Sequence, residues 1–174
     1  LKFKMVLELE YEWECWYDHA VSGRSAQNYE DTLHKVCTLR SVEEFWGCYA
    51  HLSGIHTLGP KCGYHFMKKG VKPMWEHPQN KEGGIWQFKV PKESAQTVWK
   101  DFLISVIGHS YSEFLKEQVN GISITNRQGE FYINMWVDSQ DPQNGVANWF
   151  AEQTQVPAKS VFKTCFSLIK NYKS

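Results

Sequence analysis

The segment 70–86, which reads GVKPMWEHPQNKEGGIW, restricts the fold of this chain more than any other. Pro73 and Pro78 lack a backbone N–H and disfavour the helical region for the residue before them, so no regular helix or central strand can run through it. The asparagine and the paired glycines that follow are turn formers. The sequence therefore predicts a stiffened loop that carries Trp75 and Glu76 side by side.

The Trp75–Glu76 pair has two interpretations. An indole beside a fixed carboxylate suits a flat, cationic ligand, because the ring face attracts cations and the carboxylate accepts hydrogen bonds. Alternatively, Trp75 folds back into the core and Glu76 is solvated surface. For an isolated Trp–Glu pair the second interpretation is the more common one, so the rest of the chain has to decide.

The length of 174 residues suits one domain, which we expect to span 1–174 with flexible ends at 1–7 and 167–174. Aromatic residues make up 15% of the chain, which favours a compact core, a stacking site or both. The 19 basic and 19 acidic residues cancel. This balance argues against a protein that coats nucleic acid through its phosphates, but allows one that reads a small, chemically distinct piece of it.

The cysteines predict reduced thiols in an intracellular protein. They are odd in number, scattered and without a C-x-x-C pair, which argues against a disulfide framework or a zinc site: Cys15, Cys37, Cys48, Cys62 and Cys165. Cys62 and His65 could supply two metal ligands, but no second pair has a matching spacing. We therefore expect no metal and no cofactor.

The chain contains no sequence motif of a known enzyme class. It lacks H-E-x-x-H, G-x-S-x-G and a phosphate-binding loop, and no apolar run approaches the roughly 20 residues of a membrane span. We expect a protein that is not an enzyme, makes no membrane contact and acts in the cytoplasm, with the nucleus as a second location.

Hydrophobic periodicity predicts an α+β domain. A capping box at Ser41–Glu44 starts one helix, a second helix spans 94–107, and a third begins around Pro142. Alternation in the first strand leaves an acidic outer face. Strands are expected over 7–17, 33–39, 64–67, 85–90, both arms of a hairpin at 121–137, and 161–166. This order favours an antiparallel sheet with helices on one face and the other face free.

Two patterns place large side chains away from the core. The hairpin alternation puts Arg127 and Trp136 on the free face of the sheet, opposite an apolar face. On the helical wheels, Trp46 and Ile104 lie off the core stripes of their helices. A core position for Trp46 is the competing interpretation.

The motifs, taken in order, resemble those of the eukaryotic mRNA cap-binding translation initiation factors of the four-E type. The resemblance covers roughly residues 13 to 165, and its most specific part is Pro-Met-Trp-Glu followed by Asn-Lys-x-Gly-Gly-x-Trp in the segment 70–86. It implies a curved antiparallel sheet with three α-helices on its convex face and the ligand cleft on its concave face. The implied ligand is the 7-methylguanosine triphosphate end of mRNA.

The resemblance also implies a role for each residue of the cap site. Tyr29 and Trp75 would sandwich the positively charged base, and Glu76 would accept hydrogen bonds from its N1–H and N2–H groups. Trp136 would contact the N7 methyl group. Arg127 would meet the phosphates.

The chain departs from the family pattern at three cap-site positions. Tyr29 stands where tryptophan is usual, which is similar to a divergent subclass often linked to repression, and offers a smaller stacking face. Ile85 and Tyr132 stand where basic residues are usual. Phosphate binding would then rest on Arg127 with contributions from the C-terminal region, where the candidates are Lys163, Lys170 and Lys173.

In the family a helical motif of a partner protein, Tyr followed by four residues, Leu and an apolar residue, docks on the back of the sheet. The matching positions here are Val42, Trp46, Asp101, Ile104 and Gly108. The implied partners are a scaffold initiation factor of the four-G type or a four-E-binding regulatory protein. Apolar residues outside a core stripe suit such helix-in-groove binding.

Three functions remain open from the sequence. The chain is a cap-binding factor that recruits a scaffold for initiation, a cap-binding homologue that represses translation or serves selected mRNAs, or an interaction adaptor that has lost cap affinity. Tyr29 favours the second. The missing basic residues keep the third open, whereas the retained Trp75, Glu76 and Trp136 argue against it.

Overall fold

The structure, a computed structural model, describes residues 6–19, 29–110, 115, 118–142, 144–157 and 159–173. This part of the chain forms a seven-stranded antiparallel sheet of order β2-β1-β3-β5-β6-β4-β7. The strands are β1 (Glu8–Asp18), β2 (Leu33–Ser41), β3 (Gly63–Lys68), β4 (Gly84–Val90), β5 (Val119–Arg127), β6 (Glu130–Val137) and β7 (Lys159–Thr164). The helices are α2 (Val42–His51), the short 3₁₀ helix η1 (Ile55–Thr57), α3 (Ala95–Ile107), α4 (Val146–Thr154) and α5 (Cys165–Lys173).

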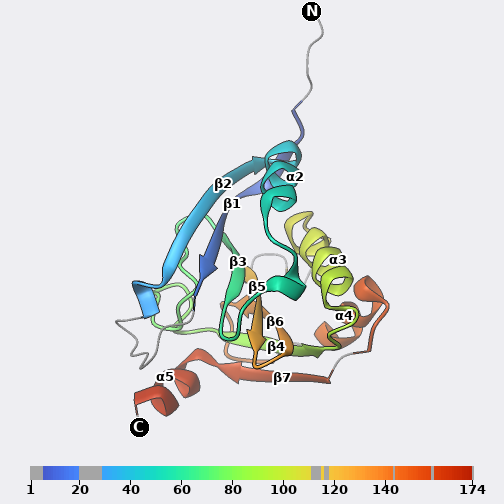
Figure 1. The fold of residues 1–174 in the computed structure, drawn as a ribbon. Coiled ribbons are helices and arrows are strands. Elements are labelled where there is room, and N and C mark those ends of the chain that lie inside the picture. The colour runs from blue at the N-terminus through green and yellow to red at the C-terminus, as the bar shows by residue number, and fades with distance from the viewer. Residues whose placement is uncertain are drawn as a thin grey trace, which may run out of the picture.

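The helices divide between the two faces of the curved sheet. Helices α2, α3 and α4 lie together on one face, whereas α5 lies apart from them, at the lower left of the view (Figure 1). The predicted α+β class and the three helices on the back of an antiparallel sheet are therefore confirmed. In the described residues, none of the helices has both the length and the apolar character needed to cross a bilayer.

The main core lies between the sheet and the three grouped helices. Trp13 of β1 and Trp99 of α3 are fully buried in it. Phe88 of β4 stacks on Phe150 of α4 with ring centroids 4.1 Å apart, and Phe102 of α3 packs edge-on against the same Phe150 ring. Offset or edge-on aromatic pairs add to the free energy of burial, so the abundant aromatics stabilise the joint between sheet and helices.

A second, smaller apolar cluster lies on the other face of the sheet. Its buried members come from four strands, the segment 70–86 and the start of α5: Trp16, Met67, Val71, Ile85, Trp136 and Cys165. The sheet is consequently covered on both sides over part of its area. This cluster forms the support on which a site on the free face has to be built.

The predicted local signals fold largely as expected. Ser41 caps α2, since its hydroxyl accepts a hydrogen bond from the Glu44 N–H at 3.2 Å. The Glu44 carboxylate, however, accepts from the Arg40 N–H, one residue before the cap. The hairpin turns at Gln128 and Gly129, which both have positive φ, as a two-residue turn between twisted strands requires.

One strand prediction is wrong in part. Glu14 was expected on an acidic, solvated face of the first strand, but it is only 6% exposed. Its carboxylate accepts a hydrogen bond from the Lys35 ammonium at 3.1 Å. The reason is that β1 lies inside the sheet between β2 and β3, and Trp16 on the same side of β1 belongs to the second cluster.

The C-terminal region also differs from the prediction. The last strand ends at Thr164 rather than 166, and α5 follows at once. Thr164 explains the switch, because its side-chain oxygen accepts a hydrogen bond from the Ser167 N–H at 3.2 Å as an N-cap residue does. Helix α4 starts later than predicted, at Val146, after Gly145 with a φ of 91°.

Candidate functional site

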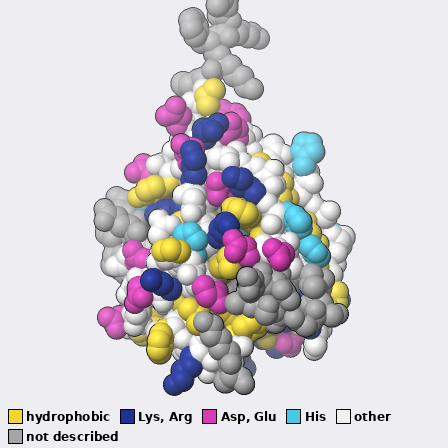
Figure 2. Space-filling model, turned by 90° about the vertical axis from the view of Figure 1, so that its left-hand side faces the viewer, with side chains coloured by type: hydrophobic (Ala, Val, Ile, Leu, Met, Phe, Trp, Pro, Cys, Tyr) yellow, Lys and Arg dark blue, Asp and Glu magenta, His cyan; other side chains and the backbone are white. Residues whose placement is uncertain are grey.

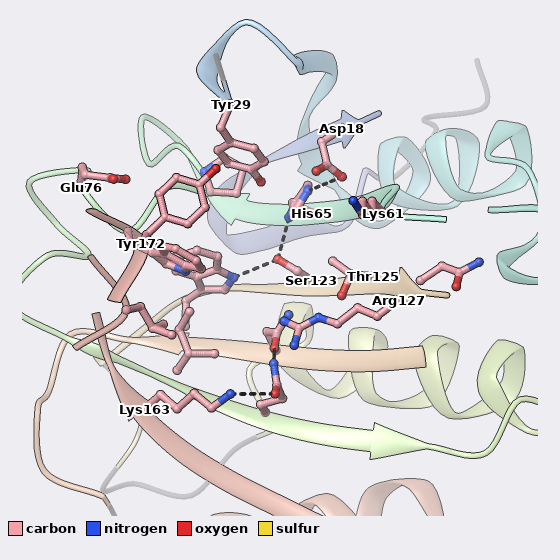
Figure 3. A pocket seen from close by; sticks show the side chains of 18 of the residues that line it. Asp18, Tyr29, Lys61, His65, Glu76, Ser123, Thr125, Arg127, Lys163 and Tyr172 are labelled. Atoms are coloured by element: carbon pink, nitrogen blue, oxygen red, sulfur yellow. Dashed lines mark hydrogen bonds and ion pairs between the residues drawn. The ribbon is translucent and has the colours of Figure 1, made fainter. Parts of the chain in front are cut away.

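A cavity of about 520 Å³ opens on the face of the sheet opposite the three grouped helices. Its walls come from the sheet, the segment 70–86, the region around Tyr29 and helix α5 (Figure 3). The residues predicted for the cap site that line the cavity are Tyr29, Trp75, Glu76, Arg127, Trp136 and Lys163. The lining also includes residues that were not predicted to contact the ligand, namely Asp18, Lys61, His65, Ile85, Gln87, Ser123, Thr125, Asn134, Leu168 and Tyr172. The structure thus brings Tyr29, Trp75, Glu76, Arg127 and Trp136 to one pocket.

The loop that carries Trp75 and Glu76 is organised by one buried side chain. The Asn80 amide donates to the backbone oxygens of Lys72 and Met74, both at 2.9 Å, and is 1% exposed. The glycines that follow allow a close approach to the sheet, because a Cβ on Gly83 would lie 2.0 Å from the backbone oxygen of Val137. The loop is therefore anchored on both sides of the Trp75–Glu76 pair.

We expect Asn80→Ala to lower the free energy of unfolding by about 1–3 kcal/mol, because it leaves two buried carbonyl groups without their donor. Urea denaturation measures the change. Gln79→Ala is the matched control, because the Gln79 side chain is exposed and the hydrogen bonds to Asn120 and His77 use its backbone groups, which the substitution keeps. Equal stability of the two variants would contradict this role of Asn80.

Aromatic rings surround the mouth of the pocket. Tyr29 and the half-buried Trp75 line it, as predicted. Tyr172 of α5 was not predicted, and its ring lies edge-on to Trp75 with centroids 5.8 Å apart. Figure 3 shows Tyr172 next to Tyr29 at the entrance. No strand or helix pattern in the sequence predicts that residue 172 returns to this face.

Trp136 is not exposed, in contrast to the expectation of a free sheet face. It is 5% exposed and belongs to the second cluster. Its indole N–H donates to the Ser123 hydroxyl at 2.8 Å, so the polar atom of the ring is satisfied within the protein. What the indole contributes to the floor of the pocket is apolar ring surface.

A buried polar chain continues from Ser123. The Ser123 hydroxyl lies 2.8 Å from Nδ1 of His65, and Nε2 of His65 lies 3.2 Å from a carboxylate oxygen of Asp18. The His65–Asp18 contact is close but poorly aligned for a hydrogen bond, so we describe it as electrostatic. All three residues are at most 3% exposed (Figure 3).

The sequence did not reveal this chain. The alternation in the hairpin placed Ser123 on the polar face of the sheet. His65 was considered only as a weak metal-ligand candidate together with Cys62. Asp18 and His65 meet because β1 pairs with β3, and His65 and Ser123 meet because β3 pairs with β5. Such neighbours follow from strand register, which spacing in the sequence does not encode.

Two predicted cations reach the pocket. Arg127, at the end of β5, lies with its guanidinium carbon 4.8 Å from the centre of the Tyr132 ring, and Lys163 donates to the Gln87 side chain at 3.2 Å. Lys61 joins them in the lining without having been predicted. Lys170 is exposed on α5 and is not a lining residue, and the side chain of Lys173 lies outside the described part of the structure.

The thiol that lies under the pocket is not a nucleophile at neutral pH. Burial, together with the nearby charge of Glu76, raises the pKa of Cys165 to about 12. A thiol with this pKa stays protonated and unreactive. The pocket itself presents ring faces, a carboxylate and two or three cations.

Comparison with known proteins decides the family. The model of the family Eukaryotic initiation factor 4E matches residues 8–173. The chain belongs to this family. The translation initiation factor 4E of Candida albicans is 34% identical over 138 residues, which cover 76% of this chain and 65% of that protein. Initiation factor NCBP of Triticum aestivum is 32% identical, covering 70% of this chain and 51% of the relative.

The initiation factor 4E fold is shared with solved structures. Ascaris suum eIF4E-3 in complex with an m7G cap superposes with a TM-score of 0.83 at 24% identity, covering 92% of both chains. Caenorhabditis elegans eIF4E-3 with the 4E-binding protein Mextli gives a TM-score of 0.84 at 23% identity, covering 95% of this chain and 97% of that one. This chain spans about half to two thirds of the length of the first curated relatives that it matches.

Within the initiation factor 4E fold, two residues of this chain replace expected cations. Ile85 is 5% exposed and belongs to the second cluster, so it gives the pocket an apolar wall. Tyr132 accepts the Arg127 guanidinium over its ring and donates its hydroxyl to Glu130 at 2.8 Å. The Tyr132 ring therefore contacts the Arg127 guanidinium instead of supplying a further cation.

The back of the initiation factor 4E fold carries the second predicted surface. Trp46 is 44% exposed on α2 and Ile104 is 36% exposed on α3, which confirms that both point away from the core. Val42 and Asp101 are half-buried and Gly108 is exposed. The structure thus leaves apolar side chains uncovered on the helices that cover the sheet, on the side away from the pocket.

Proposed function

We propose that this chain binds the 7-methylguanosine cap of mRNA in the pocket and docks a helical partner motif on its back, acting in translation initiation in the cytoplasm. The observation that carries the proposal is the anchored Trp75–Glu76 loop, which lines one pocket together with Tyr29. The family assignment supports it, as do the cap complexes of the Ascaris suum relative.

The methylated base is a flat cation, and the pocket offers what such a ligand needs. Tyr29 and Trp75 supply ring faces, and each stacked base is worth about 1–3 kcal/mol. Glu76 accepts the N1–H and N2–H groups in charge-assisted hydrogen bonds. The buried Trp136 provides apolar surface for the N7 methyl group.

The phosphates would extend along the sheet toward Arg127 and Lys163, both of which line the pocket. Figure 3 shows these two side chains pointing into the pocket from β5 and β7, which are separated in the sheet by β6 and β4. Elsewhere the charges are mixed. On the face seen in Figure 2, basic and acidic side chains are interspersed, which fits recognition of a short ligand rather than of a long nucleic acid.

Titration of the intrinsic tryptophan fluorescence tests the proposal. We expect 7-methyl-GTP to quench the emission at concentrations at which GTP has little effect, because only the methylated base is cationic. An equal response to both nucleotides, or none to either, would contradict cap binding. It would favour the adaptor function, in which only the back surface is used.

A repressor that binds the cap remains the second candidate function. The observation that favours it is Tyr29, which offers a smaller ring face than tryptophan, so that tighter cap binding is expected from Tyr29→Trp. Recruitment separates the candidates. An initiation factor retains the four-G-type scaffold when captured on a cap resin, whereas a repressor retains a regulatory protein without it.

For the back surface, we expect Trp46→Ala to weaken binding of a peptide with the Tyr-x-x-x-x-Leu-apolar motif by about 2 kcal/mol or more, as for a buried aromatic anchor. Fluorescence anisotropy of the labelled peptide measures the change. Phe166→Ala is the control, because Phe166 is also an exposed aromatic but lies on α5. An unchanged affinity for Trp46→Ala would place partner docking elsewhere.

A further inference from the structure

Three cysteines that are scattered in the sequence meet at one point of the fold. Cys15 of β1 and Cys37 of β2 are direct partners across the two strands, and Cys48 lies on α2 above them. Their Sγ atoms all lie within 4.8 Å of one another. None of the three cysteines lines the cap pocket.

The three cysteines differ in their burial. Cys15 is fully buried, whereas Cys37 and Cys48 are half-buried at the edge of α2. The Sγ atoms of Cys37 and Cys48 are 2.7 Å apart. Among the described residues, no histidine, aspartate, glutamate or further cysteine joins this group. Three sulfurs therefore converge, and two of them belong to half-buried residues.

We propose that Cys15, Cys37 and Cys48 form a three-thiolate site for a soft d¹⁰ metal ion, either Zn²⁺ or Cu⁺. Thiolates are the ligands that select these ions. Cu⁺ would be held by the three sulfurs alone, whereas Zn²⁺ would take solvent as its fourth ligand, since it prefers four.

The geometry is compatible with such an ion. With metal–sulfur bonds of about 2.3 Å, the sulfurs of a tetrahedral or trigonal site lie about 3.8–4.0 Å apart. The three Sγ atoms already lie within 4.8 Å of one another, which is close to this spacing. On metal binding, the sulfurs of Cys37 and Cys48 would move apart from their separation of 2.7 Å.

Metal binding would deprotonate the thiols. A thiolate is the form that coordinates metal. The bound ion would link β1, β2 and α2, which is the helix that carries Trp46.

Metal titration of the reduced, metal-free chain under anaerobic conditions tests the proposal. Co²⁺, as a spectroscopic substitute for Zn²⁺, should bind one to one with sulfur-to-cobalt charge-transfer absorption that Zn²⁺ removes. In a separate arm, a chromophoric Cu⁺ chelator should lose one equivalent of Cu⁺ to the protein. One equivalent in either arm supports the site and identifies its ion.

Variants assign the ligands. We expect Cys37→Ser and Cys48→Ser to lower the affinity by more than about 100-fold, since even the loss of an outer-shell partner costs roughly 10–100-fold. Cys62→Ser is the matched control, because Cys62 is a buried free thiol outside the group, and it should bind as the parent does. Near-ultraviolet circular dichroism verifies that each variant is folded.

Three results would overturn the proposal. They are the absence of binding in both arms, unchanged affinity in Cys37→Ser and Cys48→Ser, and a Cys37–Cys48 disulfide that forms in air even with Zn²⁺ present, as detected by peptide mass mapping. The last result would mean that Cys37 and Cys48 are oxidised by oxygen rather than held by a metal ion. None of these outcomes bears on cap binding, which is measured with nucleotide in the metal-free chain.

Discussion

Glu76→Ala should reduce the affinity for 7-methyl-GTP by at least about 100-fold. The carboxylate is proposed to accept two hydrogen bonds from the cationic base, and a hydrogen bond to a charged group contributes about 1.5–3 kcal/mol. Fluorescence titration measures the loss. The fold should persist, because Glu76 is half-buried at the pocket and lies outside the main core.

Two further variants serve as comparisons for Glu76→Ala. Glu82→Ala removes an exposed carboxylate of the same segment and should bind like the parent. Arg127→Ala should keep the preference for the methylated base, while it weakens the contribution of the triphosphate and its dependence on salt. Should Glu76→Ala bind as tightly as Glu82→Ala, the proposed base recognition is wrong.

The second large effect is expected at the buried polar chain. His65→Ala removes the partner that faces Asp18, whose side chain is 4% exposed, and opens a cavity beside it. Leaving a buried acceptor without one of its partners costs about 1–3 kcal/mol, and the cavity adds to this cost. Urea denaturation should therefore show a large loss of stability. His56→Ala, at an exposed histidine, should be close to neutral.

A double-mutant cycle separates the pairing from the cavity. The double variant Asp18→Ala/His65→Ala should lose less stability than the sum of the losses in the two single variants. The reason is that the second substitution removes a group that the first left without this partner. Full additivity would mean that Asp18 and His65 do not interact. The cycle needs no ligand, so its outcome is independent of cap binding.

The proposed cap site was predictable where its residues belong to one continuous motif. Pro73 and the turn formers around Trp75 and Glu76 act locally, and the structure has the same stiff loop at the rim of the pocket. Trp46 and Ile104 were found by helical periodicity, which depends only on neighbours along the chain. Fold class followed from the order of such local signals.

What could not be predicted depends on strand order. Glu14 lies on the side of β1 that a simple alternation leaves to solvent, but β1 is an inner strand with apolar cover on that side. Asp18, His65 and Ser123 come from three strands and meet only through register. Tyr172 reaches the pocket on a helix whose start depends on the cap at Thr164.

The proximity of the three cysteines could not be predicted for a similar reason. Their spacing in the sequence argued against a metal site, because compact ligand motifs place their cysteines two to four residues apart. Strand pairing and the packing of α2 nevertheless bring Cys15, Cys37 and Cys48 together. Spacing rules detect sites built on one turn or loop, and they miss sites assembled across a sheet.

The hydrogen-bond chain below the pocket has a direction. Since an indole N–H can only donate, Ser123 accepts from Trp136, and the Asp18 carboxylate favours the proton of His65 on the nitrogen that faces it. Nδ1 of His65 is then free to accept the Ser123 O–H. The Trp136 and Ser123 donors are therefore both used inside the protein. The ring of Trp136 offers a ligand apolar surface, on which a methyl group rests more favourably than a hydrogen-bond donor would.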